Sequence, residues 1–325
     1  MLTLAAPSLA LMPFRQDMLA DPATMSYNAP YFPPKGTIAF PESDWDAWLT
    51  KWNKPGTDRF CAYLMDGETP VGEISWHDGG AGMGVVIKSE YRGRGYGAEG
   101  LRLLMTEAFE KANLLSLRND FETERQPAMA MHLAAGFVPV AEKDGITTLI
   151  LTRDAYIARK RAAWIQQTYD AMCEYERGVP ERIHHLVKVH SFARQIALHE
   201  KLDAATRFTL EIAALTHDIG IKPAEAQYGH CAGPLQERLG PPEAVAMLGV
   251  LALPKDVIDR VCFLIGHHHT VEGVDAIDWR ILLEADFLVN MIESHYAQPA
   301  IDKVRDTVFR TAEGKRLLAQ IRPEQ

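Results

Sequence analysis

The pattern of apolar residues changes halfway along this 325-residue chain, and this change constrains the fold more than any other feature. In the first half, short β-type runs such as Phe60 to Leu64 and Val71 to Trp76 alternate with a helical stretch from Ala98 to Ala112. In the second half, apolar residues recur at helical spacing over long stretches, and strand-like runs are nearly absent. The sequence therefore predicts two domains, an α/β domain over residues 1–153 and an all-α helical bundle over residues 154–325.

Charge and cysteine content narrow the function classes. With 43 acidic and 34 basic side chains the net charge is -9, and no basic patch offsets it, so the sequence predicts no nucleic-acid partner. The apolar stretch from Leu2 to Met12 is too short to span a membrane and predicts a first strand and its turn. The four cysteines have no CxxC spacing, which favours a reduced, cytoplasmic setting. Small-molecule substrates are expected, and the sequence leaves the oligomeric state open.

A glycine-rich turn joins an apolar strand to a helix in the first half. The string VVIKSEYRGRGYGAEGLRLLM spans residues 85–105 and places Arg92, Gly93, Arg94, Gly95, Tyr96 and Gly97 between the two elements. Glycines let successive backbone N–H groups turn towards one point, and the helix N-terminus adds partial positive charge. The segment predicts an anion cradle suited to a pyrophosphate.

This context resembles the GNAT acyltransferase family, whose coenzyme A motif has the form Arg/Gln-x-x-Gly-x-Gly/Ala, and Arg92, Gly95 and Gly97 match it. The likeness covers about residues 1–153 and implies a twisted mixed sheet with helices and acetyl-coenzyme A as acyl donor. It also implies donor-binding residues. These are Val85 and Ile87 for the pantetheine arm, and Arg92, Gly93, Arg94, Gly95, Tyr96, Gly97 and Ala98 for the phosphates.

Two positions depart from the family pattern. His132 stands where many members carry a tyrosine proposed as general acid for the departing thiolate, and a neutral histidine can also donate a proton. Gln126 stands where the family often has asparagine. The base that deprotonates the acceptor amine is left open among Glu73, His77 and Glu122.

Histidine is concentrated in the second half, which holds ten of the 12. Residues 209–220 read TLEIAALTHDIG, which predicts an apolar helix that ends in adjacent His217 and Asp218, with Gly220 as the helix stop. A buried His-Asp pair is costly unless a cation binds it, and imidazole and carboxylate ligands suit divalent transition metals. His185 and Asp286, on two other apolar helices, are the candidate additional ligands.

The order His, His-Asp, Asp resembles the HD superfamily of metal-dependent phosphohydrolases over roughly residues 178–292. The resemblance implies that His185, His217, Asp218 and Asp286 bind one or two divalent ions (Mn, Fe, Co, Ni, Zn or Mg). Asp218 would also assist proton removal from the attacking water, and Arg182 would hold phosphate.

Three adjacent histidines, His267, His268 and His269, suggest a second metal or phosphate contacts, and His267 and His268 are the favoured ligands. Two positions depart from the family pattern. Gln236 stands where dinuclear members place a histidine, which counts against a dinuclear centre. Ile221 stands where a lysine usually follows the His-Asp-x-Gly string, and Lys222 comes one position later.

The sequence therefore predicts a bifunctional enzyme, in which the first domain acetylates an amine and the second hydrolyses a phosphate ester, with a nucleotide-like substrate. Two alternatives remain open at this stage. The helical domain would sense a nucleotide without hydrolysing it and regulate the acetyltransferase, or the first domain would be a binding module without catalysis.

Overall fold

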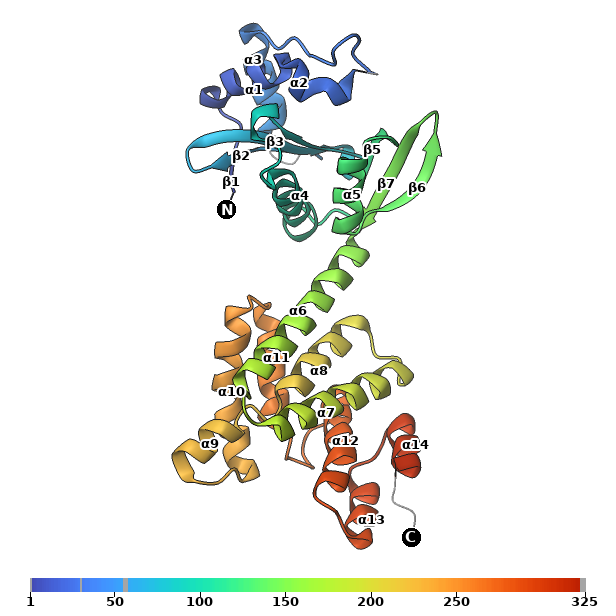
Figure 1. The fold of residues 1–325 in the computed structure, drawn as a ribbon. Coiled ribbons are helices and arrows are strands. Elements are labelled where there is room, and N and C mark those ends of the chain that lie inside the picture. The colour runs from blue at the N-terminus through green and yellow to red at the C-terminus, as the bar shows by residue number, and fades with distance from the viewer. Residues whose placement is uncertain (1, 30, 55–57, 322–325) are drawn as a thin grey trace. The chain divides into compact units, whose positions relative to one another are not determined.

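A computed structural model of the protein describes residues 2–29, 31–54 and 58–321 (Figure 1). The chain forms two compact units, residues 1–159 and 160–325. The division falls inside helix α6 (Arg153–Tyr175), whereas the sequence placed the domain boundary just before this helix. Among the described helices, none is long and apolar enough to cross a membrane.

The first unit contains two antiparallel sheets instead of the one mixed sheet that was predicted. The first sheet has the order β1-β2-β3-β4 and the second β5-β7-β6, and every strand pair is antiparallel. The strands are β1 (Thr3–Ala5), β2 (Phe60–Asp66), β3 (Thr69–His77), β4 (Gly82–Ile87), β5 (Ser116–Glu122), β6 (Val138–Lys143) and β7 (Ile146–Thr152). The expectation of a mixed sheet was wrong because β4 and β5 do not pair, and a cavity is lined by both strands.

Helices cover both faces of the first sheet (Figure 1). They are α1 (Met12–Ala20), α2 (Pro22–Met25) and α3 (Trp45–Trp52) on one face, and α4 (Tyr96–Thr106) on the other; α5 (Gln126–Ala135) lies beside β5. Side chains alternate along each strand, so Leu64 packs in the same cluster as Leu101 of α4, and the adjacent Tyr63 packs with Met12 and Phe40 on the other face. Burial on both faces fixes the register of the central strands.

The described secondary structure of the second unit is entirely helical, as predicted. After α6 follow α7 (Pro180–His199), α8 (Ala204–Thr216), α9 (Ile221–Tyr228), α10 (Gly233–Val250), α11 (Lys255–Ile265), α12 (Ile277–Glu293), α13 (Gln298–Thr307) and α14 (Ala312–Ile321). Their core includes Val189 of α7, Ile212 of α8, Leu264 of α11 and Leu282 of α12, each fully buried. These four helices contribute side chains to one close-packed core, and polar side chains on their inner faces are therefore held in fixed positions.

Candidate functional site

A groove of about 470 Å³ lies in the first unit between the end of β4, the glycine-rich turn and the start of α5. Of the nine predicted donor-binding residues, six line it: Val85, Ile87, Arg92, Gly93, Tyr96 and Gly97. Arg94, Gly95 and Ala98 belong to the same turn and helix start but do not line the groove. The structure thus brings the strand end and the turn together around one concave surface.

The glycines of this turn hold backbone conformations that other residues rarely adopt. Gly93 has φ of 78° and Gly95 has φ of 83°, and α4 begins at the next residue, Tyr96. The first backbone N–H groups of a helix have no acceptor within the helix, and its dipole places partial positive charge at this end. Since Tyr96 and Gly97 line the groove, it ends at a site suited to a phosphate group.

Arg92 supports the shape of this groove through contacts with backbone carbonyl groups. Its guanidinium donates from Nε to the Ile87 carbonyl oxygen at 3.2 Å, from Nη1 to that of Ala23 at 3.0 Å, and from Nη2 to that of Thr24 at 2.7 Å. These bonds tie the end of β4 to helix α2. The residue that the family motif assigns to phosphate binding therefore fixes the backbone around the site.

A second cavity of about 450 Å³ lies beside the groove, between β4 and β5. His132 lines it but is only 3% exposed. Its Nδ1 lies 2.8 Å from the carbonyl oxygen of Ala128, which can only accept, so Nδ1 carries the proton and Nε2 accepts a hydrogen bond from Asn119 at 2.9 Å. Burial lowers the pKa of this imidazole. In this arrangement His132 holds Asn119 in place and has no free proton to donate.

The three candidates for a general base differ in position. Glu122 lines the cavity between β4 and β5. Glu73 is buried in an ion pair with Arg15, and His77 forms an exposed pair with Asp78 at 2.7 Å. Neither Glu73 nor His77 lines the cavity.

Sequence reasoning missed two residues that line both the groove and the cavity, Tyr27 and Arg125. The Arg125 guanidinium lies over the Tyr27 ring, 5.1 Å from its centroid. Tyr27 follows α2, 65 residues before Arg92 at the start of the glycine-rich turn, and no local pattern marks it. Arg125 directly precedes α5, where only its position next to the motif region could have drawn attention to it.

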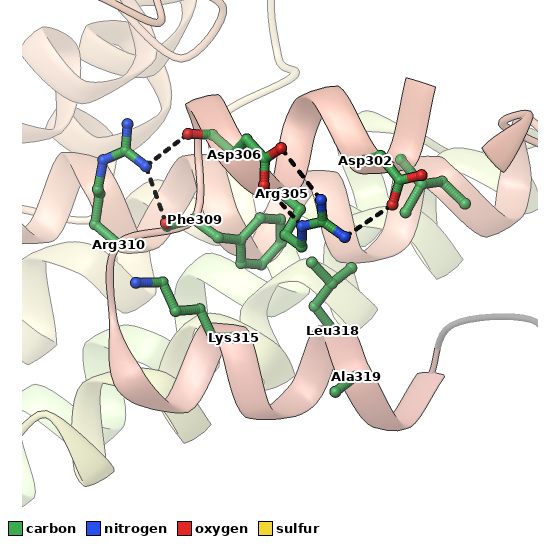
Figure 2. Close-up of a pocket in the computed structure, with 9 residues that line it drawn as sticks. Asp302, Arg305, Asp306, Phe309, Arg310, Lys315, Leu318 and Ala319 are labelled. Carbon is green, nitrogen blue, oxygen red and sulfur yellow. Dashed lines mark hydrogen bonds and ion pairs between the residues drawn. The ribbon is translucent and has the colours of Figure 1, made fainter. Parts of the chain in front are cut away.

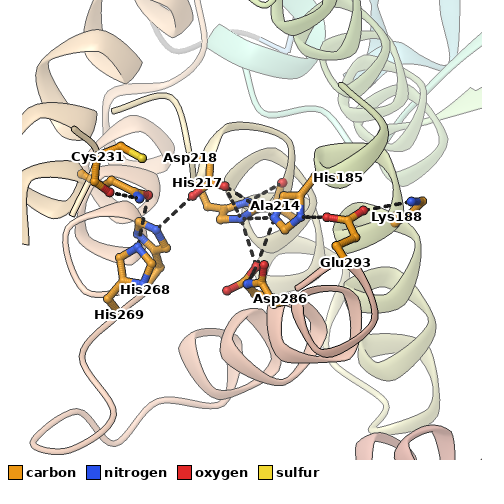
Figure 3. A network of polar contacts seen from close by, with 12 residues as sticks. His185, Lys188, Ala214, His217, Asp218, Cys231, His268, His269, Asp286 and Glu293 are labelled. Carbon is orange, nitrogen blue, oxygen red and sulfur yellow. Dashed lines mark hydrogen bonds and ion pairs between the residues drawn. The ribbon is translucent and has the colours of Figure 1, made fainter. Parts of the chain in front are cut away.

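In the second unit, the structure gathers five of the six predicted ligands from four segments into one cluster (Figure 3). The cluster comprises His185 of α7, His217 and Asp218 after α8, His268 after α11 and Asp286 of α12. Nε2 of His185 lies 3.3 Å from Nε2 of His217, 3.2 Å from Oδ1 of Asp286 and 3.5 Å from Oδ2 of Asp218. Nε2 of His268 lies 3.3 Å from Oδ1 of Asp218.

The composition of the cluster fits a divalent metal ion. Donor atoms of His185, His217 and Asp218 all lie within 4.8 Å of one another. The buried Nε2 of His268 has no hydrogen-bond partner of good geometry, although a carboxylate oxygen is near. Burial opposes charge on the Asp286 carboxylate, but its hydrogen bonds with His185 and His217 lower its pKa. Nitrogen and carboxylate donors around one point, without a thiolate, are the set expected of a catalytic metal site.

The side chains of the three consecutive histidines, His267, His268 and His269, have different surroundings. His268 belongs to the cluster, and Asp218, His268 and His269 form a second group whose donor atoms lie within 4.8 Å of one another. His269 Nε2 also lies 3.1 Å from the side-chain oxygen of Gln236. The predicted ligand His267 lies elsewhere, because its ring stacks on Phe263 at 4.3 Å and its Nδ1 contacts the Phe263 carbonyl oxygen at 2.7 Å.

Arg182 does not present a free guanidinium. It donates from Nη1 to Glu176 at 3.3 Å and forms a short ion pair from Nη2 to Glu225. To hold a phosphate, this side chain would have to exchange one of its two carboxylate partners for the ligand.

The turn that carries His217 and Asp218 is positioned by a close backbone contact. Helix α8 ends at Thr216, and Gly220 has φ of -73°, so the expected helix-stop role of this glycine was wrong. A Cβ at Gly220 would lie 2.5 Å from the Gln236 carbonyl oxygen and 2.8 Å from the Gly240 nitrogen. Glycine is needed here because the backbones of the turn and of α10 touch.

A further cavity of about 460 Å³ in this unit lies between α13 and α14 (Figure 2). Its floor is apolar, with Phe309 and Leu318, and Arg305 on its rim is paired with Asp302 at 2.9 Å and with Asp306 at 2.7 Å. None of the predicted site residues lines it.

The first unit has the features of an α/β protein that binds a phosphate-bearing ligand at a glycine-rich strand-to-helix turn. Residues 2–138 match the family model of the acetyltransferase (GNAT) domain. The first unit therefore contains a GNAT acetyltransferase domain, which confirms the resemblance of the first half. No family model matches the second half, so its likeness to the HD superfamily stays a prediction.

Comparison with solved structures gives matches that cover about half of this chain. A spermidine N-acetyltransferase from Vibrio cholerae, in complex with CoA and spermine, has 16% sequence identity and a TM-score of 0.40, over 48% of this chain and 98% of that chain. A spermidine/spermine N-acetyltransferase from the same organism, in complex with manganese ions, has 16% identity and a TM-score of 0.38, over 49% of this chain and 96% of that chain. Comparison with the curated proteins gave no match.

Proposed function

We propose that the first unit transfers an acetyl group from acetyl-coenzyme A to the nitrogen of an amine. The observation that carries this proposal is the groove bounded by the end of β4, the Gly93–Gly97 turn and the N-terminus of α4, within a GNAT domain. The phosphates of the donor would lie at the helix start, and its thioester would point into the neighbouring cavity between β4 and β5.

The chemistry needs an amine that has lost its proton. The amine nitrogen attacks the thioester carbonyl carbon, a C–N bond forms, the C–S bond breaks, and the thiolate leaves. Glu122 is the candidate base that lines the cavity, and we assign it the proton of the attacking amine. His132 positions Asn119, because its Nδ1 proton and its Nε2 lone pair are both engaged.

The test of this activity measures CoA binding by calorimetry and thiol release with a panel of amines, spermidine and amino acids among them, on the full chain. Gly95→Ala should weaken CoA binding, because alanine strains the turn at φ of 83°. Gly145→Ala is the matched control. Its φ is 75° with open space around it, and it lies in the β6–β7 hairpin. If the unaltered protein neither binds CoA nor releases thiol with any amine, the proposal is wrong.

For the second unit we infer a divalent-metal-dependent phosphate-ester hydrolase, supported by the His185, His217, Asp218, His268 and Asp286 cluster (Figure 3). When bound, a divalent ion would activate water and neutralise phosphate oxygens. His185 of α7, His217 after α8 and Asp286 of α12 would hold it, and Asp218 belongs to both groups of donor atoms and would serve both. Asp218 would also accept a proton from the attacking water.

Metal analysis of the full chain, purified without a histidine tag, tests this site. A His217→Ala, Asp218→Ala double variant should lose the metal, while His184→Ala, which removes an exposed histidine next to His185 on α7, should keep it. Saturating metal at about 100 times its dissociation constant should stabilise the folded state by about 2.7 kcal/mol. Metal binding without phosphate release from a broad ester panel would favour a sensor over a hydrolase.

A further inference from the structure

The groove of the first unit has two cationic side chains in its lining, Arg92 and Arg125. All three kinds of donor nitrogen of Arg92 already bind carbonyl oxygens, those of Ile87, Ala23 and Thr24. Three of the five N–H donors of Arg92 are thus engaged with the backbone. Arg125 is the second cation in the lining of the groove and is the stronger candidate for an ionic contact with a bound anion.

Arg125 is held in place without being neutralised at close range. Its guanidinium lies over the Tyr27 ring, 5.1 Å from the centroid, so the side chain has a supporting surface. Its ion-pair partner is Glu122, whose Oε2 lies 3.8 Å from Nε of Arg125, beyond hydrogen-bond distance. The side chain is 38% exposed and can therefore reach a bound ligand.

The charges around Arg125 also favour an anion. Both cations line the same groove, and burial, followed by the positive charge of Arg125, lowers the pKa of the Arg92 guanidinium. An anion bound beside Arg125 would offset this positive charge. The start of α4 faces the same groove through Tyr96 and Gly97 and offers backbone N–H groups to the same anion.

We propose that Arg125 is the residue that binds the phosphate oxygens of the acyl donor, while Arg92 shapes the groove. The inference rests on the proposed acetyltransferase function. Arg125 and the glycine-rich turn both line the groove, so a guanidinium and a helix N-terminus would together hold the donor's phosphates. A guanidinium in this place selects a donor with phosphate over one that carries the pantetheine arm alone.

The test compares three ligands on the full chain by calorimetry: CoA, dephospho-CoA and S-acetylpantetheine, which lacks phosphate. Arg125→Gln should raise the Kd for CoA about tenfold or more and leave that for S-acetylpantetheine unchanged. Equal losses for CoA and dephospho-CoA would place the contact on the pyrophosphate, and a loss confined to CoA would place it on the 3′-phosphate; both support the proposal. Arg102→Gln, which removes an exposed cation from α4 outside the groove, should change none of the three.

Three results would overturn the inference, and each is distinct. Equal weakening of CoA and S-acetylpantetheine in Arg125→Gln would show a general structural role. Unchanged CoA binding together with slower transfer to carboxylate-bearing amines would place Arg125 in acceptor recognition. If the unaltered protein binds no CoA, the acetyltransferase proposal itself fails, and this is seen before any variant is made.

Discussion

Glu293 accepts a hydrogen bond from Nδ1 of His185 at 2.9 Å, and this leaves Nε2 of the same ring facing Asp286 at 3.2 Å. The second oxygen of Glu293 accepts from Lys188 at 2.9 Å. A carboxylate that holds the far nitrogen of a histidine fixes the tautomer and orientation of the ring, as in many metal sites. Sequence reasoning did not single out Glu293, which stands at the last position of α12.

We therefore expect Glu293→Gln to weaken divalent-metal binding about 10- to 100-fold, since an amide can also donate and no longer enforces one tautomer of His185. Titration of Mn²⁺ into the metal-free full chain measures the effect. Lys188→Gln, which leaves the Glu293 carboxylate in place, should have a smaller effect. Mn²⁺ affinity in Glu293→Gln equal to that of the unaltered protein would contradict the prediction.

Arg92→Lys should destabilise the first unit by about 1–2 kcal/mol, because an ammonium group cannot reach three carbonyl oxygens in the planar arrangement that the guanidinium uses. Calorimetric melting of the full chain would show a lower transition temperature. Arg102→Lys, a change of the same type at an exposed position of α4, serves as the control and should melt like the unaltered protein. Equal melting of the two variants would mean that the Arg92 contacts add no net stability.

His132 should stay neutral to a lower pH than an ordinary histidine, because burial lowers its pKa from the usual value of about 6.5. NMR titration of the histidine ring protons measures this, and the resonance that is missing in His132→Asn identifies the residue. The unfolded chain protonates first, so this residue makes folding less favourable as the pH falls from about 6.5 to the folded pKa. A midpoint at or above 6.5 would disprove the assignment.

Gly220→Ala should destabilise the second unit by about 1–3 kcal/mol, since the new Cβ would meet backbone atoms of Gln236 and Gly240 that cannot move independently of α10. Gly249→Ala is the control, because Gly249 lies on α10, the helix that Gly220 contacts, with nothing within 4 Å of a new Cβ. The control should stabilise the protein by about 0.5–1 kcal/mol. Urea unfolding of both variants gives the comparison, and a neutral Gly220→Ala would show that the contact can relax.

The parts of the fold that follow local rules could be predicted from sequence. The glycine-rich turn, the strands before it and the helices of the second half all follow from the periodicity of apolar residues and from backbone conformation. The pairing of strands could not be read in the same way. Whether β4 and β5 pair or separate depends on the side chains packed between them. Here the two strands line a cavity and are not joined by backbone hydrogen bonds.

The candidate sites show the same limit. His185, His217, Asp218 and Asp286 could be chosen because each is a polar residue within an apolar helical pattern. The orientation of the three histidines could not, because α11 ends at Ile265 and helical geometry no longer applies to the residues that follow. Glu293 and Arg125 stand next to helix ends, where charged residues are common, so nothing in the sequence distinguished them.

Helix α6 has a consequence for how these two units can be separated in experiments or exchanged between proteins. Tyr156 of this helix stacks on Phe109 in the first unit, whereas Trp164 donates to the Leu251 carbonyl oxygen in the second. A truncation at the division between residues 159 and 160 would cut a continuous helix and leave new backbone groups unpaired on both fragments. Fragments that each retain the whole of α6 are the better-founded starting point for modular recombination, since neither would then end inside the helix.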